Sequence, residues 1–101
     1  MRMLMFVKLP VEPFNALVRD GSASSTMKRI LDDIKPEAAY FTTMDGCRGG
    51  VVIVNLDHAS DIPRIAEPWF LHFNAAVTFE PAMTPDDLAH ANLDAIGKQW
   101  S

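Results

Sequence analysis

The order of its apolar segments constrains this chain more than any other feature of the sequence. In turn, the segments indicate strand, helix, strand, strand, helix and strand within about the first eighty residues, and a capped helix follows. This order is the split βαβ arrangement, in which helical connections lie on one face of an antiparallel sheet. The sequence therefore predicts an α+β fold with a four-stranded antiparallel sheet and an additional C-terminal helix, formed by one domain over residues 1–101.

The predicted strands come from alternating or β-branched runs. Residues 3–9 place apolar side chains on both faces at the centre of the strand, with charged residues at its margins. Residues 38–44 and 51–54 form a hairpin around a glycine-rich turn at 45–50. Residues 75–80 supply the fourth strand.

Prolines and small polar residues mark the predicted helices. A helical segment follows Pro13 and ends before Pro36, and Asp20-Gly21-Ser22 interrupts its apolar stripe, which predicts either one bent helix or two pieces. A second, short helix begins at Asp57 or Ser60 and is expected to stop at Pro68. Asp57, His58 and Asp61 also resemble a carboxylate and imidazole cluster, but helix capping is the favoured interpretation.

The C-terminal helix has the clearest start in the chain. Thr84 is a hydroxyl N-cap, and the proline and two aspartates that follow it suit a first helical turn. Its apolar residues recur at helical spacing: Ala89, Leu93, Ile96 and Trp100. This stripe either closes the core of its own subunit or extends over a neighbouring one.

Composition limits the classes of function. The chain has 101 residues, a net charge of −4 and no run of Lys or Arg, which argues against nucleic-acid binding. No apolar stretch approaches the ~18 residues of a membrane span, so we expect no membrane partner and a cytoplasmic location. The single Cys47 cannot form an internal disulfide, and His58, His72 and His90 lack metal-ligand spacing, so we expect no metal site.

Three segments resemble those of a known group of proteins. They are the Met-rich first strand, the run Gly49-Gly50-Val51-Val52-Ile53-Val54, and Pro68–Phe73 leading into Val77-Thr78-Phe79-Glu80. Over about residues 2–82 the chain resembles the dimeric α+β barrel superfamily, which includes muconolactone isomerase-like proteins and antibiotic-biosynthesis-type monooxygenases. The resemblance implies a ferredoxin-like subunit, two of which pack their open sheet faces together, and a ligand cleft between sheet and helices.

A homodimer also follows from the residues themselves. Two helical crossovers cover only one face of a four-stranded sheet, and Leu4 and Phe6 belong to the other face. Left uncovered, that face would be a larger apolar patch than a soluble monomer normally exposes. The expected partner is a second copy of the chain.

Four residues are candidates for a small-molecule site: Tyr40, Trp69, His72 and Glu80. A ligand pocket is mainly apolar with a few converging polar groups. His72 or Glu80 could act as a general base, and Tyr40 could orient a substrate oxygen. Each also has a structural interpretation: a core or interface aromatic for Tyr40 and Trp69, a hydrogen-bonded structural histidine for His72, and a strand end for Glu80.

Two functions remain open at this level. The first is a homodimeric protein that binds a small organic molecule without catalysis of its own. The second is an enzyme without a cofactor, of isomerase or monooxygenase type, acting on a small aromatic or lactone-like substrate, as the resemblance implies. A buried pair of titratable groups in a closed cleft would favour the enzyme, whereas an interior filled by apolar side chains would favour binding alone.

Overall fold

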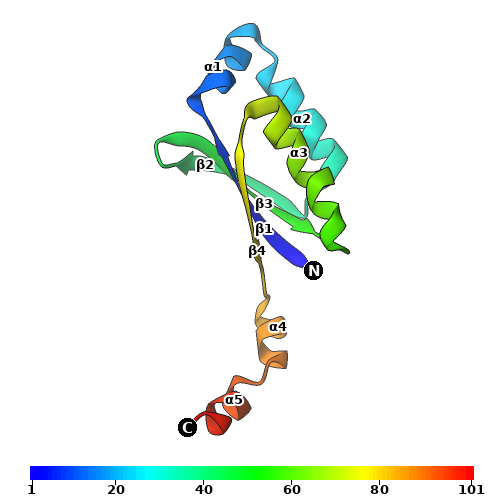
Figure 1. Ribbon diagram of the computed structural model, residues 1–101, viewed down its shortest axis with the longest axis vertical. Helices are drawn as coiled ribbons and strands as arrows, with labels where there is room; N and C mark the ends of the chain where they lie inside the picture. The colour runs from blue at the N-terminus through cyan, green and yellow to red at the C-terminus, as the bar shows by residue number, and fades with distance from the viewer.

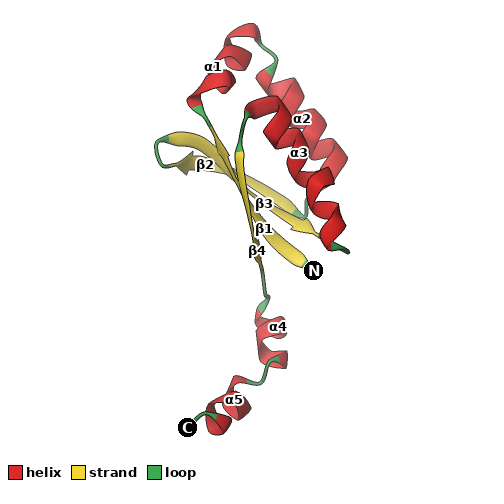
Figure 2. Ribbon diagram, in the orientation of Figure 1, coloured by secondary structure: helices red, strands yellow, loops and turns green.

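One antiparallel sheet forms the framework of the protein, and helices pack on one of its faces (Figure 1). The structure is a computed structural model that describes residues 1–101. Figure 2 shows that short loops connect most of the helices and strands. In chain order the elements are β1 (Arg2–Leu9), α1 (Val11–Asp20), α2 (Ala23–Ile34), β2 (Ala38–Met44), β3 (Cys47–Asn55), the 3-10 turn η1 (Ala59–Asp61), α3 (Ile62–Phe73), β4 (Ala76–Pro81), α4 (Pro85–His90) and α5 (Leu93–Gln99).

The strand order in the sheet is β2-β3-β1-β4, and all neighbouring pairs are antiparallel. Helices α1 and α2 connect β1 to β2, and β3 lies between these two strands in the sheet. Helix α3 connects β3 to β4, and β1 lies between those two strands. Each helical connection therefore passes over one intervening strand. This confirms the predicted α+β class and the four-stranded antiparallel sheet, and it is compatible with the ferredoxin-like arrangement.

Strand β1 carries the core on one of its faces. Met3, Met5, Val7 and Leu9 are buried, whereas the residues between them are only half-buried. This alternation follows from the two-residue period of a strand, with the buried set turned toward the helices. The most deeply buried large side chains complete the packing: Trp69, Phe73, Met5, Ile65, Val7 and Val52.

The helical segment before β2 consists of two helices, as the second of the two alternatives predicted. Gly21 ends α1 in the left-handed conformation, with φ of 83°, and its N–H donates to the Val18 carbonyl at 3.2 Å. The Asp20 carboxylate accepts hydrogen bonds from both the backbone N–H and the hydroxyl of Ser22, at 2.8 and 2.6 Å. These bonds hold the pKa of Asp20 below its usual value.

Helix α3 differs from the prediction at both of its ends. It continues past Pro68 to Phe73 and ends at Asn74, because burying Trp69 and Phe73 beyond the proline stabilises the continuation more than the lost backbone bond destabilises it. At the start, α3 begins only at Ile62, and the 3-10 turn η1 precedes it; the Asp61 carboxylate caps η1 by accepting the backbone N–H groups of His58 and Asp57, each at 3.1 Å. Capping is therefore the role of this cluster, and Asp61 performs it.

The hairpin turn is shorter than predicted. Only Asp45 and Gly46 form it, both with positive φ, and β3 already begins at Cys47. The glycines that follow are strand residues with a packing role. A Cβ on Gly49 would lie 2.7 Å from the Met44 side chain and 3.0 Å from the Val7 carbonyl oxygen, so any larger residue would have to displace the Met44 side chain and crowd that carbonyl.

The predicted C-terminal helix is two short helices, α4 and α5. Asn92 separates them in the left-handed conformation, with φ of 53°, and its side chain accepts the Ala95 N–H at 3.4 Å. Both helices project away from the sheet, as Figure 1 shows. The predicted start at Thr84 is confirmed, since its hydroxyl accepts the Asp87 N–H at 3.1 Å.

Trp69 provides a test of the core. Its side chain is 1% exposed, and its indole N–H has no hydrogen-bond partner. We expect Trp69→Ala to lower the free energy of unfolding by about 3–5 kcal/mol. Trp69→Phe keeps most of the ring volume and removes the unpaired donor, so its loss should be below about 1.5 kcal/mol. Urea denaturation measures the free energy of unfolding of both variants. Equal decreases would show that the indole contributes more to stability than the apolar volume that Phe also supplies.

Candidate functional site

Two of the predicted site residues lie on the face of the sheet that no helix covers, here called the open face. Tyr40 is 64% exposed on β2, and Glu80 is exposed at the end of β4. In the register of the sheet, Tyr40 stands opposite Val51 and Glu80 stands opposite Leu4. The two residues therefore share a face but lie on the outer strands at opposite sides of the sheet.

The other two candidates lie elsewhere. Trp69 belongs to the core, where its ring packs 6.1 Å from that of Phe73. His72 is exposed on the outer side of α3 and lines a hollow of about 480 Å³ between α2 and α3 together with Arg29 and Asp33. No single pocket brings the four predicted residues together, because α3 and the sheet lie between His72 and Glu80.

The interior between sheet and helices is filled by apolar side chains. No polar or charged residue is buried there, and the aromatic rings of Phe14, Trp69 and Phe73 occupy its centre. The segment around Trp69 and Phe73 carries much of this packing, and it is also the segment that most resembled a ligand site in the sequence. An aromatic cluster gives the same sequence pattern whether it fills a core or lines a pocket.

An apolar cleft does open at the edge of this interior, between helices α1 and α2 and the helix-facing side of β2. Its volume is about 520 Å³, within the range usual for small-molecule sites. Six hydrophobic side chains and three polar ones line it: Phe14, Val18, Ala23, Met27, Leu31 and Phe41, with Ser24, Lys28 and Asp32. We call it the α1–α2 cleft.

Phe14 is the best-fixed residue of this cleft. Its ring lies 5.2 Å from that of Phe73, and the Arg48 guanidinium sits 4.9 Å from its centroid in a cation–π contact. Arg48 also donates a hydrogen bond to the Asn15 side chain at 2.8 Å. Arg48 thus holds one wall of the cleft in place.

The cleft is polar only at its mouth. Lys28 and Asp32 lie one helical turn apart on α2 and form an ion pair of 2.6 Å between exposed side chains. The opposite wall is Phe41 of β2, which remains 54% exposed. A ligand here would meet apolar surface along its length and a charged pair at one end.

Phe14, Met27 and Leu31 belong to the apolar stripe of the helical segment predicted between Pro13 and Pro36, but the sequence does not assign them to a site. A stripe marks the face of a helix that turns toward other side chains, and it does not tell whether those side chains fill the space in front of it. The break at Gly21 was the available signal. Two helices that diverge at a break leave a gap that a continuous helix would not.

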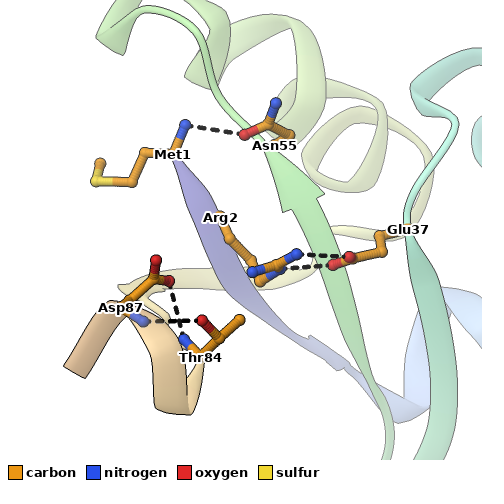
Figure 3. A network of polar contacts seen from close by, with 6 residues as sticks. All are labelled: Met1, Arg2, Glu37, Asn55, Thr84 and Asp87. Carbon is orange, nitrogen blue, oxygen red and sulfur yellow. Dashed lines mark hydrogen bonds and ion pairs between the residues drawn. The ribbon is translucent and has the colours of Figure 1, made fainter. Parts of the chain in front are cut away.

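A second hollow, of about 660 Å³, is polar and lies near the start of β1 (Figure 3). The Arg2 guanidinium donates two hydrogen bonds of 2.8 Å to the Glu37 carboxylate, and the amino group of Met1 donates to Asn55 at 2.8 Å. The Arg2 hydrogen bonds lower the pKa of Glu37. Asp87 lines the same hollow, and backbone and hydroxyl hydrogen bonds with Thr84 lower its pKa.

The polar groups of this second hollow already satisfy one another. Arg2 pairs with Glu37, and Asp87 caps helix α4 together with Thr84. The first pair ties the start of β1 to the residue before β2, and the second set of bonds lies within the cap of α4. They leave the α1–α2 cleft as the candidate functional site.

The structure contains no group of three or more His, Cys, Asp or Glu side chains that could hold a metal ion. None of its helices has both the length and the apolar character needed to cross a membrane. A scan of the chain against protein-family models gives no match, and a search of curated proteins gives none either.

Acid pH should expose the role of the Arg2–Glu37 pair. The pKa of Glu37 is lowered in the folded protein from its usual 4.5. Its stabilising effect is therefore complete above that value and is lost as pH falls through the folded pKa. Thermal melts between about pH 6 and pH 2.5 should show a shallower decline in Tm for Glu37→Gln than for the unsubstituted protein.

Glu67 supplies the matched control for that experiment. It is an exposed glutamate of α3 that takes part in no ion pair of the structure. Glu67→Gln should leave the acid-side slope unchanged. If both variants decline alike, the pair makes no specific contribution to stability.

Proposed function

We propose that this protein forms a homodimer through its open sheet face and binds a small, mainly apolar organic molecule in the α1–α2 cleft. The apolar cleft itself carries the proposal. It has the size of a small-molecule site, and its walls come from three different elements that the core holds in place. The resemblance to the dimeric α+β barrel superfamily points to the same kind of site, between sheet and helices.

The lining indicates the chemical class of the ligand. Phe14 and Phe41 present aromatic surface, and Met27 offers a thioether that adapts to flat rings. At the mouth, Lys28 could pair with an acidic group of the ligand in place of Asp32. A small aromatic or alicyclic molecule with one carboxylate or sulfonate fits this arrangement.

Binding is favoured over catalysis by the chemistry of the lining. An isomerase or monooxygenase without a cofactor needs a general base close to the bound substrate. The titratable groups at the cleft, Lys28 and Asp32, are exposed and pair with each other. The enzyme alternative would have to place its base in another part of the molecule.

The open face supports the dimer. Its central rows contain the half-buried apolar residues Leu4, Phe6, Val51 and Ile53, with exposed Tyr40 beside them on β2. No helix of the chain covers this surface (Figure 1). A second copy would cover it with an identical surface, which is the commonest way for a soluble chain to close such a face.

Ligand binding can be tested with 8-anilinonaphthalene-1-sulfonate, an apolar ring system with one anionic group. The protein should enhance its fluorescence in a saturable way. Leu31→Gln, which places a polar group in the cleft, should weaken the affinity on the order of tenfold, because it removes about 1.5 kcal/mol of apolar contact. Leu71→Gln, on the exposed outer side of α3, is the control and should leave the affinity unchanged.

Two results would contradict this site. The first is an affinity that Leu31→Gln does not change, since the dye would then bind elsewhere. The second is a set of amide chemical-shift changes that clusters on the open face rather than around Phe14 and Phe41. Weaker dye binding by the Lys28→Gln variant would show, in addition, that the sulfonate lies at the mouth of the cleft.

The dimer can be tested by charging the open face without disturbing the core. Thr78 is exposed on β4, opposite Phe6, so a lysine there is compatible with a folded monomer. Light scattering should give twice the 11.2 kDa chain mass for the unsubstituted protein and the single mass for Thr78→Lys. Leu71→Lys, on the outer side of α3, should remain dimeric, and an unsubstituted protein of single mass would show that the dimer is wrong.

A further inference from the structure

Residues 82–101, here called the C-terminal arm, leave the sheet at the end of β4 and extend beyond it (Figure 1). The last backbone hydrogen bond between arm and sheet runs from the Ala82 N–H to the Arg2 carbonyl, at 3.0 Å. Every residue from Pro85 onward is exposed. The arm is therefore held at its base and free along its length.

The arm nevertheless has the sequence of a helix that packs against something. Leu93, Ile96 and Trp100 follow one another at spacings of three and four residues, which places them on one side of α5 and its C-terminal cap residue. Together with Leu88 of α4 they are between 42% and 79% exposed. Polar, charged and small residues occupy the remaining positions of α4 and α5, and these four apolar side chains are here called the stripe of the arm.

Neither helix is long enough to be stable alone. Helix α4 has six residues and α5 has seven, whereas isolated helices shorter than about 12–15 residues are marginal in water. The capping bonds at Thr84 and Asn92 favour the helical conformation but bury no apolar surface. Helices of this length need a packing surface.

The body of the same chain does not provide that surface. The apolar side chains in and against the core extend no further along the chain than Phe79. The radius of gyration is 17.0 Å, compared with about 13 Å for a compact domain of 100 residues, and the longest dimension is 59 Å. The extended arm accounts for this excess.

The open face of the sheet has a small area for a stable interface. The four strands contain 30 residues in total, and each residue covers about 16 Å², so the open face presents roughly 500 Å² in projection. A stable interface buries about 800 Å² of accessible surface on each partner. The open face alone is therefore a small interface, and the uncovered apolar arm of each subunit could enlarge it.

We infer that the C-terminal arm of each subunit packs its stripe of Leu88, Leu93, Ile96 and Trp100 against a second copy of the chain. The inference rests on the proposed homodimer and adds a second contact surface to it. Each chain has one arm and one open face, so a two-fold pair covers both kinds of surface on both subunits.

Trp100 reports directly on this contact. The chain has only two tryptophans, so the full-length Trp69→Phe protein has Trp100 as its sole indole. Its fluorescence emission and its quenching by acrylamide are measured over a dilution series, while sedimentation velocity gives the mass at each concentration. We expect blue-shifted, weakly quenched emission in the dimer and the emission of free N-acetyltryptophanamide in the monomer.

The outcomes separate the arm from the dimer. A dimer in which Trp100 emits like the free reference at every concentration overturns the arm contact and leaves the proposed dimer intact. A monomer at every concentration overturns both. A blue shift that does not change while the dimer dissociates shows that the arm folds on its own chain, which also overturns the inference.

A pair of matched variants tests the stripe itself. Ile96→Glu places a carboxylate within the stripe, and Ala95→Glu places the same group on the opposite side of α5. Ile96→Glu should raise the dimer dissociation constant by about tenfold or more, whereas Ala95→Glu should leave it within about twofold. Equal effects of the two variants would show that the stripe makes no contact.

Discussion

The packing of Trp69 and Phe73 of α3 against the buried face of β1 is the interaction on which the remaining structure depends. Strand β1 is central in the sheet, with β3 on one side and β4 on the other. Met5 and Val7 on this strand are almost completely buried and belong to the same core cluster as the two rings. The same strand turns its intervening residues to the open face, so one segment defines both the interior and the surface that is left without cover.

The α1–α2 cleft is a consequence of how the helices meet this core. Helix α3 packs Trp69 and Phe73 into the core, and the break at Gly21 separates α1 from α2. The core fixes Phe14 through Phe73, while Arg48 fixes it from the strand side. A cleft whose wall is also a core residue keeps its shape without a ligand, which lowers the cost of ordering on binding.

Most of the architecture could be predicted from the sequence because it depends on local patterns. The alternation in residues 3–9, the strong strand run at 51–54 and the capping residues at Thr84 each carry their own physical signal. The errors arose where distant contacts decide. Pro68 remains within a helix because of what Trp69 and Phe73 contact, and the apparent glycine loop at 49–50 is strand because Met44 packs onto it. The candidate site was harder for the same reason, since the exposure of His72 and the burial of Trp69 depend on which side of α3 faces the sheet.

The contact between Gly49 and Met44 has a consequence for strand register. Strand β2 is at the edge of the sheet and pairs only with β3, so its alignment depends on that single partner. A shift of two residues along β3, which preserves the faces of the sheet, would bring the Val51 side chain to the position that Gly49 leaves free. The Val51 side chain would then crowd the Met44 side chain, because even a Cβ at Gly49 would lie 2.7 Å from the Met44 sulfur in the native register. A residue without a side chain thus disfavours the misaligned hairpin and keeps Tyr40 opposite Val51 and Phe41 opposite Gly50.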